Sequence, residues 1–321
     1  MIPIEPEQNI QPVSYRIFGR QLESTNPQKT CDDADFFWQK LPSGELVSII
    51  IDGITRDFSP DGSYPTIARE AADFLREELS RSFYSLCNQQ TDKPDYPELL
   101  VTSMIHANSA LHDFNTQRGY TKENTNYANR DLPGAAAIIS VVENNNLHLA
   151  MIADATAHIF DNNGGKRVTP IQTDGKEQQW KYVHNAYPEH ASLDIWNRYY
   201  REHYRNKDGA EGIIDGKPVQ TAFGALTGEE EARSFIVSLT IPLNSETIIL
   251  VTSDGILSVD TAEMHEIIMR HCQEGTPHMI LSEIFGHALS QAEDQKHHAD
   301  DMTAVLMIPQ SLIMLYYSHV H

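Results

Sequence analysis

The sequence has few of the residues that build disulfide frameworks or thiolate metal sites. Its 321 residues include only three cysteines, Cys31, Cys87 and Cys272, which are far apart and form no CxxC pair. No group of histidine and cysteine residues has the spacing of a zinc site. We therefore expect neither a disulfide scaffold nor a structural zinc site, and a reducing compartment is the simplest interpretation.

Long apolar runs and an excess of basic residues are also missing. No apolar run approaches the roughly 18 residues of a membrane-spanning helix, and residues 1–10 lack the basic and apolar parts of a signal peptide. Lysine and arginine number 24 against 45 aspartates and glutamates, which gives a net charge of −21. Such a chain repels nucleic acid and anionic membranes and can attract cations, so we expect it to bind neither of the two. From the missing signal peptide and membrane span, and from the few cysteines, we expect a cytoplasmic protein.

Apolar content of 40% is sufficient for a core, and hydrophobic periodicity indicates how it is organised. We expect strands over residues 46–51, 134–142, 147–152, 158–160, 166–170, 235–239, 247–252 and 303–308. We expect helices from about residues 65 and 95 onward, and over about 261–272 and 276–292. This order favours one α+β domain in which two helix pairs cover β-sheets.

Two segments do not fit this pattern. Residues 174–217 are polar, aromatic-rich and weakly periodic, which predicts an insertion or a flap without clear elements. The apolar tail 309–321 is compatible with an added element, a contact surface or disorder.

Acidic residues stand at the ends of the most apolar strands. Asp52 follows LVSIII, Asp254 follows TIILVTS, and Asp300 and Asp301 precede TAVLMI. A carboxylate at the end of a buried strand is held in place, as a metal ligand must be, and oxygen donors without histidine or cysteine select Mg²⁺ or Mn²⁺. Asp-Gly after a strand is also ordinary turn chemistry, so the pattern alone leaves both interpretations open.

Six short motifs follow one another along the chain: CDDA at 31–34, IDG at 51–53, GAAA at 134–137, IADA at 152–155, TSDGI at 252–256 and DDMT at 300–303. In this order they resemble the motifs of the metal-dependent type 2C (PPM) Ser/Thr protein phosphatases. The resemblance spans roughly residues 14–308. Ile54 replaces a histidine of the eukaryotic members, which favours a divergent bacterial relative.

The resemblance implies a four-layer α-β-β-α sandwich, with two antiparallel sheets flanked by helix pairs and a binuclear Mn²⁺ or Mg²⁺ centre at one end. Residues 1–308 would form one such domain. The residues that match the family's metal ligands are Asp52 as the bridge, Gly53 through its carbonyl, Asp254 and Asp300 on one ion, Asp32 on the other, and Asp154 on a weaker third ion. Asp33 would support the ligands or exchange roles with Asp32.

The implied activity is hydrolysis of phosphoserine or phosphothreonine on a protein substrate, with metal-bound hydroxide as the nucleophile. Several positions depart from the family pattern. Gln28 replaces the phosphate-binding arginine, for which Lys29 or Arg56 could substitute, and Ser258 replaces an aspartate linked to the third ion. These departures keep open a second hypothesis, an inactive pseudophosphatase that serves as a binding module. A hydrolase of another phosphoester is a third, and no feature of the sequence indicates the oligomeric state.

Overall fold

The computed structural model describes residues 13–25, 32–54, 66–90, 93–125, 131–173, 193–207, 211–214, 217–220, 222–296 and 298–317.

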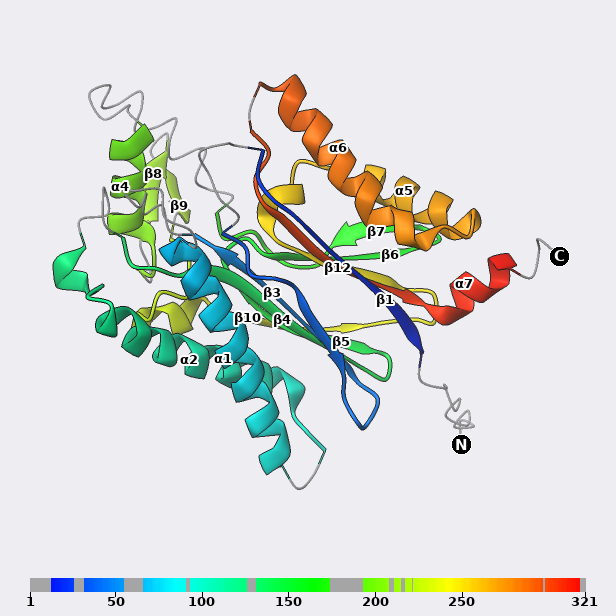
Figure 1. Cartoon of the computed structure of the whole chain (residues 1–321), viewed down its shortest axis with the longest axis horizontal. Helices are drawn as coiled ribbons and strands as arrows, with labels where there is room; N and C mark the ends of the chain where they lie inside the picture. Colours follow the sequence, from blue (N-terminus) through cyan, green and yellow to red (C-terminus); the bar gives the residue numbers. More distant parts are fainter. Residues whose placement is uncertain are drawn as a thin grey trace.

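Two β-sheets face each other, and a pair of helices packs on the outer face of each (Figure 1). Helices α1 (Ile67–Gln89) and α2 (Tyr96–Gln117) cover one sheet. Helices α5 (Thr261–Gln273) and α6 (Ile280–Asp294) cover the other. The expected four-layer α-β-β-α architecture is therefore confirmed.

All neighbouring strands within the two large sheets are antiparallel. The sheet under α1 and α2 has the order β10 (Val237–Pro242), β5 (Asn146–Ile152), β4 (Ala135–Glu143), β3 (Leu46–Gly53) and β2 (Phe37–Lys40). The sheet under α5 and α6 has the order β1 (Tyr15–Leu22), β12 (Met302–Pro309), β11 (Ile248–Thr252), β6 (Thr156–Asp161) and β7 (Gly164–Arg167).

The central strands are apolar on both faces because one face meets the opposite sheet and the other meets helices. Between the sheets, Ile50, Ile138 and Met151 belong to the same buried cluster as Val251 and Val305. Burial of each such side chain contributes roughly 1.5–3 kcal/mol. The LVSIII and TAVLMI runs are thus explained as strands at the centre of four layers.

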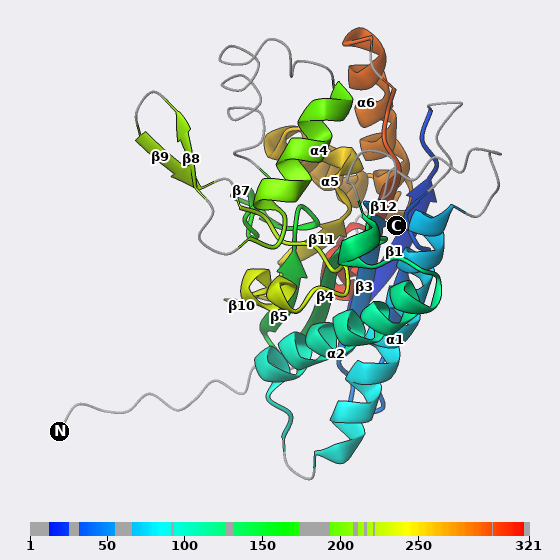
Figure 2. The ribbon, with the colours of Figure 1, turned by 90° about the vertical axis from the view of Figure 1, so that its left-hand side faces the viewer.

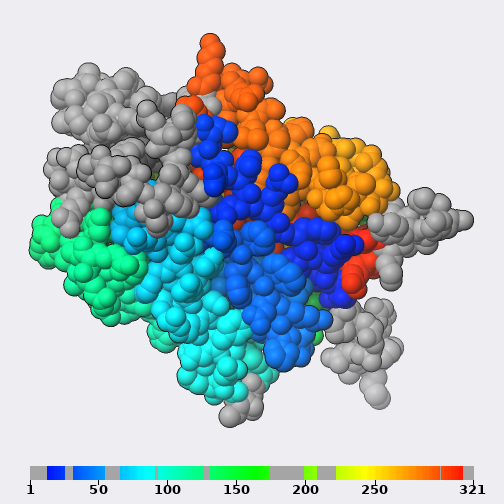
Figure 3. Space-filling view, in the orientation of Figure 1, coloured from blue at the N-terminus to red at the C-terminus, as the bar shows by residue number. Residues whose placement is uncertain are grey.

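The strand registers place the ends of several strands at one end of the sandwich. In one sheet, Asp52 pairs with Ala136 at the beginning of β4. In the other, Thr252 at the end of β11 pairs with Thr156 at the beginning of β6. The backbone N–H of Asp32 donates to the Asp301 carboxylate over 2.8 Å and joins the two edges. In the space-filling view, β1 and the segment that begins at residue 32 fill the seam between the two helix pairs (Figure 3).

The polar segment 174–217 contains regular structure, so the expectation that it lacks clear elements is wrong. Helix α4 (Leu193–Tyr204) and strand β8 (Glu211–Ile214) lie within it, and β9 (Lys217–Gln220) completes a hairpin with β8. Figure 2 shows α4 and this hairpin at one end of the sandwich. The 12-residue helix has tyrosines and charged residues in place of the aliphatic stripe by which helices are recognised.

The apolar tail begins with helix α7 (Gln310–Tyr317), whose Leu312 and Ile313 are buried in the cluster beneath α5 and α6. This finding favours the added element among the three interpretations of the tail. Short 3₁₀ turns complete the fold: η1 (Lys122–Asn124), η3 (Glu230–Phe235), η4 (Asp254–Ile256) and η5 (Pro277–Met279). None of the helices in the described ranges has the length and apolarity of a membrane span.

Candidate metal centre

Five aspartates lie close enough together at the strand-end edge of the sandwich for the charges of four to raise the pKa of the fifth. Burial raises the pKa of Asp52 well above its usual range, and the negative charges of Asp33, Asp254, Asp154 and Asp300 raise it further. These residues come from five separate segments of the chain. The structure therefore brings together five of the aspartates that the sequence singles out.

The pKa values of two further carboxyl groups in this cluster are also raised. Burial, followed by the charges of Asp154 and Asp300, raises the pKa of Asp254 to about 8. Burial also raises the pKa of Asp33 to about 6, although hydrogen bonds from Thr303 and with Asp52 oppose that shift. Clustered carboxylates repel one another, so a cation that neutralises them would be favoured at this edge.

The glycine of each Asp-Gly pair allows the backbone of a neighbouring acidic segment to lie directly against it. A Cβ atom on Gly53 would lie 2.5 Å from the carbonyl oxygen of Asp32. A Cβ atom on Gly255 would lie only 1.9 Å from the carbonyl oxygen of Asp301. Both distances are far below van der Waals contact, so any larger residue would push the acidic segments apart.

Asp33 is fully buried and is held by the ends of β11 and β12. The Thr303 hydroxyl donates to Asp33 Oδ2 over 2.6 Å. The Thr303 N–H donates to Ser253 Oγ over 2.9 Å, and the Ser253 N–H donates to the Thr303 carbonyl over 2.9 Å. These bonds fix Asp33 against the Ser253-Asp254 turn.

Asp32 is oriented differently from Asp33. Its Oδ1 accepts a 2.5 Å hydrogen bond from the Thr66 hydroxyl at the beginning of α1. Asp33, not Asp32, is among the charges that most strongly raise the pKa of Asp52 and Asp254. The structure thus favours the exchange of roles between Asp32 and Asp33, while Asp32 as a ligand stays a prediction.

Asp301 was not among the expected ligands. Its carboxylate connects the segment before β12 to two N-terminal segments of the chain. Its Oδ1 accepts from the Ser24 N–H over 2.7 Å, and its Oδ2 accepts from the Asp32 N–H. Only 2% of its surface is exposed, whereas Asp300 beside it is exposed at the edge of the cluster. The second aspartate of DDMT therefore fixes the acidic loop in place.

Asp154 lies at the turn between β5 and β6, where its Oδ2 accepts a 3.1 Å hydrogen bond from the Thr173 hydroxyl. Burial, followed by the charge of Asp154, raises the pKa of Tyr200 on α4, which places that helix near the acidic edge. The two candidate phosphate-binding residues, Lys29 and Arg56, lie outside the described residues.

A buried ion pair that the sequence did not indicate fixes α4 beside this edge. Arg205 is 1% exposed, and its two terminal nitrogens donate to Asp131 over 2.7 and 3.0 Å. Arg201 adds a third contact to the same carboxylate at 3.0 Å. Residues 131 and 205 are far apart in a polar sequence context, and neither belongs to a motif, so no local signal could have paired them.

The chemistry of the acidic edge fits a hard divalent cation, because its donors are carboxylate and backbone oxygens. Within the described ranges, no group of three or more His, Cys, Asp or Glu side chains is arranged to hold a metal ion. Ion binding would thus require carboxyl groups of raised pKa to release their protons.

No family model matches the sequence, and no curated protein sequence matches it. Solved structures do resemble it. A C. elegans sex-determining protein superimposes with a TM-score of 0.64 and 13% identity, over 94% of this chain and 67% of that one. The S. agalactiae serine/threonine phosphatase gives a TM-score of 0.57 and 13% identity, over 92% and 100% of the two chains. The catalytic domain of the phosphatase PstP, in complex with two manganese ions, gives 0.56 and 14%, over 92% and 97%. The chain therefore has the fold of bacterial type 2C serine/threonine phosphatases, as the motifs predicted.

Proposed function

We propose that this protein is a metal-dependent phosphomonoester hydrolase that acts on phosphoserine or phosphothreonine of a protein substrate. The observation that carries the proposal is the convergence of Asp33, Asp52, Asp154, Asp254 and Asp300 at one end of a type 2C phosphatase fold. The manganese-bound PstP domain supports the choice of Mn²⁺ or Mg²⁺. A cytoplasmic location and a single catalytic domain over residues 1–308 belong to the same proposal.

Each acidic residue has a role in this proposal. Asp52 would bridge two ions and Gly53 would offer its carbonyl oxygen, while Asp254 and Asp300 would hold one ion and Asp32 or Asp33 the other. When bound, the ions would polarise the phosphoryl group and lower the pKa of an attacking water. Burial of the carboxylates at a strand-end edge would keep these groups in place through the reaction.

The test is hydrolysis of p-nitrophenyl phosphate by protein stripped with EDTA, with and without millimolar Mn²⁺. Turnover should require Mn²⁺ and should be lost in Asp52→Asn and Asp254→Asn. Asp161→Asn is a matched control, because Asp161 ends β6 away from the cluster and its Oδ1 accepts from the Asn163 N–H. Full Mn²⁺-dependent activity in Asp254→Asn would refute the assignment.

A second candidate is a pseudophosphatase that keeps the fold as a binding module. It is favoured by Gln28 and Ser258, and by the absence of an arranged metal-ligand group in the described part of the chain. Folded protein without turnover and without Mn²⁺ binding would select this candidate.

A further inference from the structure

The turn that carries Asp154 has an unusual backbone conformation. Ala153, between the end of β5 and Asp154, has φ of +70° and is 2% exposed. Residues with a Cβ atom are crowded in this left-handed region, and alanine has no side-chain group that could compensate by bonding to the nearby backbone. The surrounding structure must therefore hold Ala153 in a conformation that the residue itself does not favour.

A single residue, Gln172, bonds to both the N–H and the carbonyl of Ala153. Its side-chain Oε1 accepts from the Ala153 N–H over 3.1 Å, and its backbone N–H donates to the Ala153 carbonyl over 3.2 Å. The next residue, Thr173, donates through its hydroxyl to Asp154 Oδ2 over 3.1 Å. The Gln172-Thr173 pair thus holds the Ala153-Asp154 pair at three points, one of which is the Asp154 carboxylate itself.

The same side chain also binds a distant segment, residues 222–226, which follows the β8–β9 hairpin. The Gly224 N–H donates to Gln172 Oε1 over 2.9 Å, and Gln172 Nε2 donates to the Phe235 carbonyl over 2.6 Å. A Cβ atom on Gly224 would lie 2.2 Å from Phe235 Cβ and 2.6 Å from Cγ1 of Ile152, the last residue of β5. Glycine is therefore needed at this position for the segment to lie directly against the end of β5.

The residue before Gly224 packs on α4. The Phe223 ring stacks on the Tyr200 ring, with centroids 4.7 Å apart and an angle of 7° between the planes. The Phe223 N–H donates to the Tyr204 carbonyl over 3.2 Å, and the Phe223 carbonyl accepts from the Asn206 N–H over 2.8 Å. A displacement of α4 would therefore move Phe223 and the Gly224 N–H that follows it.

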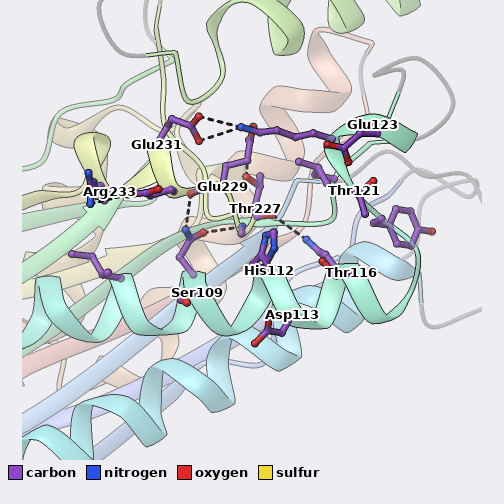
Figure 4. A pocket seen from close by; sticks show the side chains of 18 of the residues that line it. Ser109, His112, Asp113, Thr116, Thr121, Glu123, Thr227, Glu229, Glu231 and Arg233 are labelled. Carbon is purple, nitrogen blue, oxygen red and sulfur yellow. Dashed lines mark hydrogen bonds and ion pairs between the residues drawn. The ribbon is translucent and has the colours of Figure 1, made fainter.

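The other end of this segment is fixed on α2 by two buried amides. Asn115 Nδ2 donates to the Thr227 carbonyl over 3.0 Å, and Asn108 Nδ2 donates to the Glu229 carbonyl over 2.8 Å. Figure 4 shows Thr227 and Glu229 beside α2. Because α2 holds this end, we expect a displacement of α4 to be concentrated at residues 223–224.

We propose that Gln172 is the positioning residue of Asp154 and links it to α4. Its Oε1 atom accepts from both the Ala153 N–H and the Gly224 N–H, so the two segments share one acceptor. The charge of Asp154 raises the pKa of Asp52 and of Asp254, so its position affects how strongly the acidic edge attracts a cation. The link itself stands without the proposed function, whereas its effect on Mn²⁺ binding rests on that function.

The first experiment needs no metal. It is amide hydrogen exchange of EDTA-treated protein, followed residue by residue by NMR. Gln172→Met keeps the length of the side chain and removes its hydrogen bonds, so the amides of Ala153 and Gly224 should both exchange about tenfold faster, the effect of one lost hydrogen bond each. Gln172→Glu keeps an accepting oxygen and should leave both amides protected.

Unchanged protection of either amide in Gln172→Met would refute the link. If that variant does not fold, Gln172→Asn, which shortens the reach of the same amide group, takes its place with the same expected result. Gln89→Met is the matched control, because Gln89 is exposed at the end of α1 and donates only to its own helix, at Ser85. It should leave both exchange rates unchanged.

The second experiment tests whether the link serves the metal centre. Mn²⁺ affinity, measured by calorimetry, should fall about tenfold in Gln172→Met, as expected when a residue that orients a ligand is lost. Glycine adopts a positive φ without being held there. Ala153→Gly should therefore restore most of the affinity in the Gln172→Met background and change little in the wild type.

The rescue separates a positioning role from a merely structural one. If Gln172→Met loses the same affinity with and without Ala153→Gly, Gln172 does not act through the turn and the proposal is overturned. Wild-type protein that binds no Mn²⁺ would instead refute the proposed function, and the exchange rates of Ala153 and Gly224 would still decide the link.

Discussion

Replacement of Gly255 by alanine tests whether close backbone approach builds the acidic edge. The new methyl group would lie 1.9 Å from the Asp301 carbonyl oxygen, where ordinary contact begins at 3.4 Å. The turn after β11 and the segment before β12 would have to separate by about 1.5 Å. Overpacking of this kind costs about 1–3 kcal/mol of unfolding free energy, and it should also displace Asp254 from its neighbours.

The control for this substitution is Gly286→Ala. Gly286 lies within α6, and no atom lies within 4 Å of where its Cβ would be. Alanine in a helix interior should therefore stabilise the protein by about 0.5–1 kcal/mol. Both variants should be measured by urea unfolding in EDTA and by Mn²⁺-dependent turnover. A Gly255→Ala protein with wild-type stability and wild-type turnover would refute the reasoning.

Three further substitutions have defined outcomes. Burial lowers the pKa of His158 from 6.5 to about 4, so the unfolded chain binds more protons between these pH values and stability falls as pH falls through that window. His158→Gln should remove about 2.4 kcal/mol of this pH dependence, measured by urea unfolding at pH 7 and pH 4.5; an unchanged slope would contradict the assignment. Asp131→Asn leaves the buried Arg205 without its carboxylate and should cost about 3–5 kcal/mol in the same assay, and a loss below 1 kcal/mol would contradict it. Thr303→Val removes the donor to Asp33, which should raise the pKa of Asp33 and weaken Mn²⁺ binding in calorimetry, whereas unchanged affinity would show that Asp33 does not take part.

The sequence predicted the architecture because the length and apolar pattern of its main segments agree with the positions that these segments take in the fold. LVSIII and TAVLMI are too short for most helices and too apolar for a surface strand, and they are β3 and β12 at the centre of the sandwich. Helix α2 begins where the sequence predicts a helix, and Asp95 caps it, because its side chain accepts from the Glu98 N–H. The chain order of these elements fixed the fold class.

The parts that sequence reasoning missed depend on contacts between distant residues. The Asp131–Arg205 pair fixes α4, and its members are separated by 74 positions. The difference between Asp32 and Asp33 depends on which hydroxyl each carboxylate meets, Thr66 or Thr303, and adjacent identical residues carry no such information. The carboxylates at strand ends were predictable, whereas the hydrogen bond by which Thr303 holds Asp33 was not.

The central claim is that the strand-end aspartates form a divalent metal centre, and titration of Mn²⁺ into EDTA-stripped protein tests it most directly. Calorimetry should show two ions per chain, with release of protons because carboxyl groups of raised pKa must ionise to bind. Binding should be lost in Asp52→Asn and kept in Asp161→Asn. Folded protein that binds no Mn²⁺, or that binds it equally well without the Asp52 carboxylate, would contradict the account.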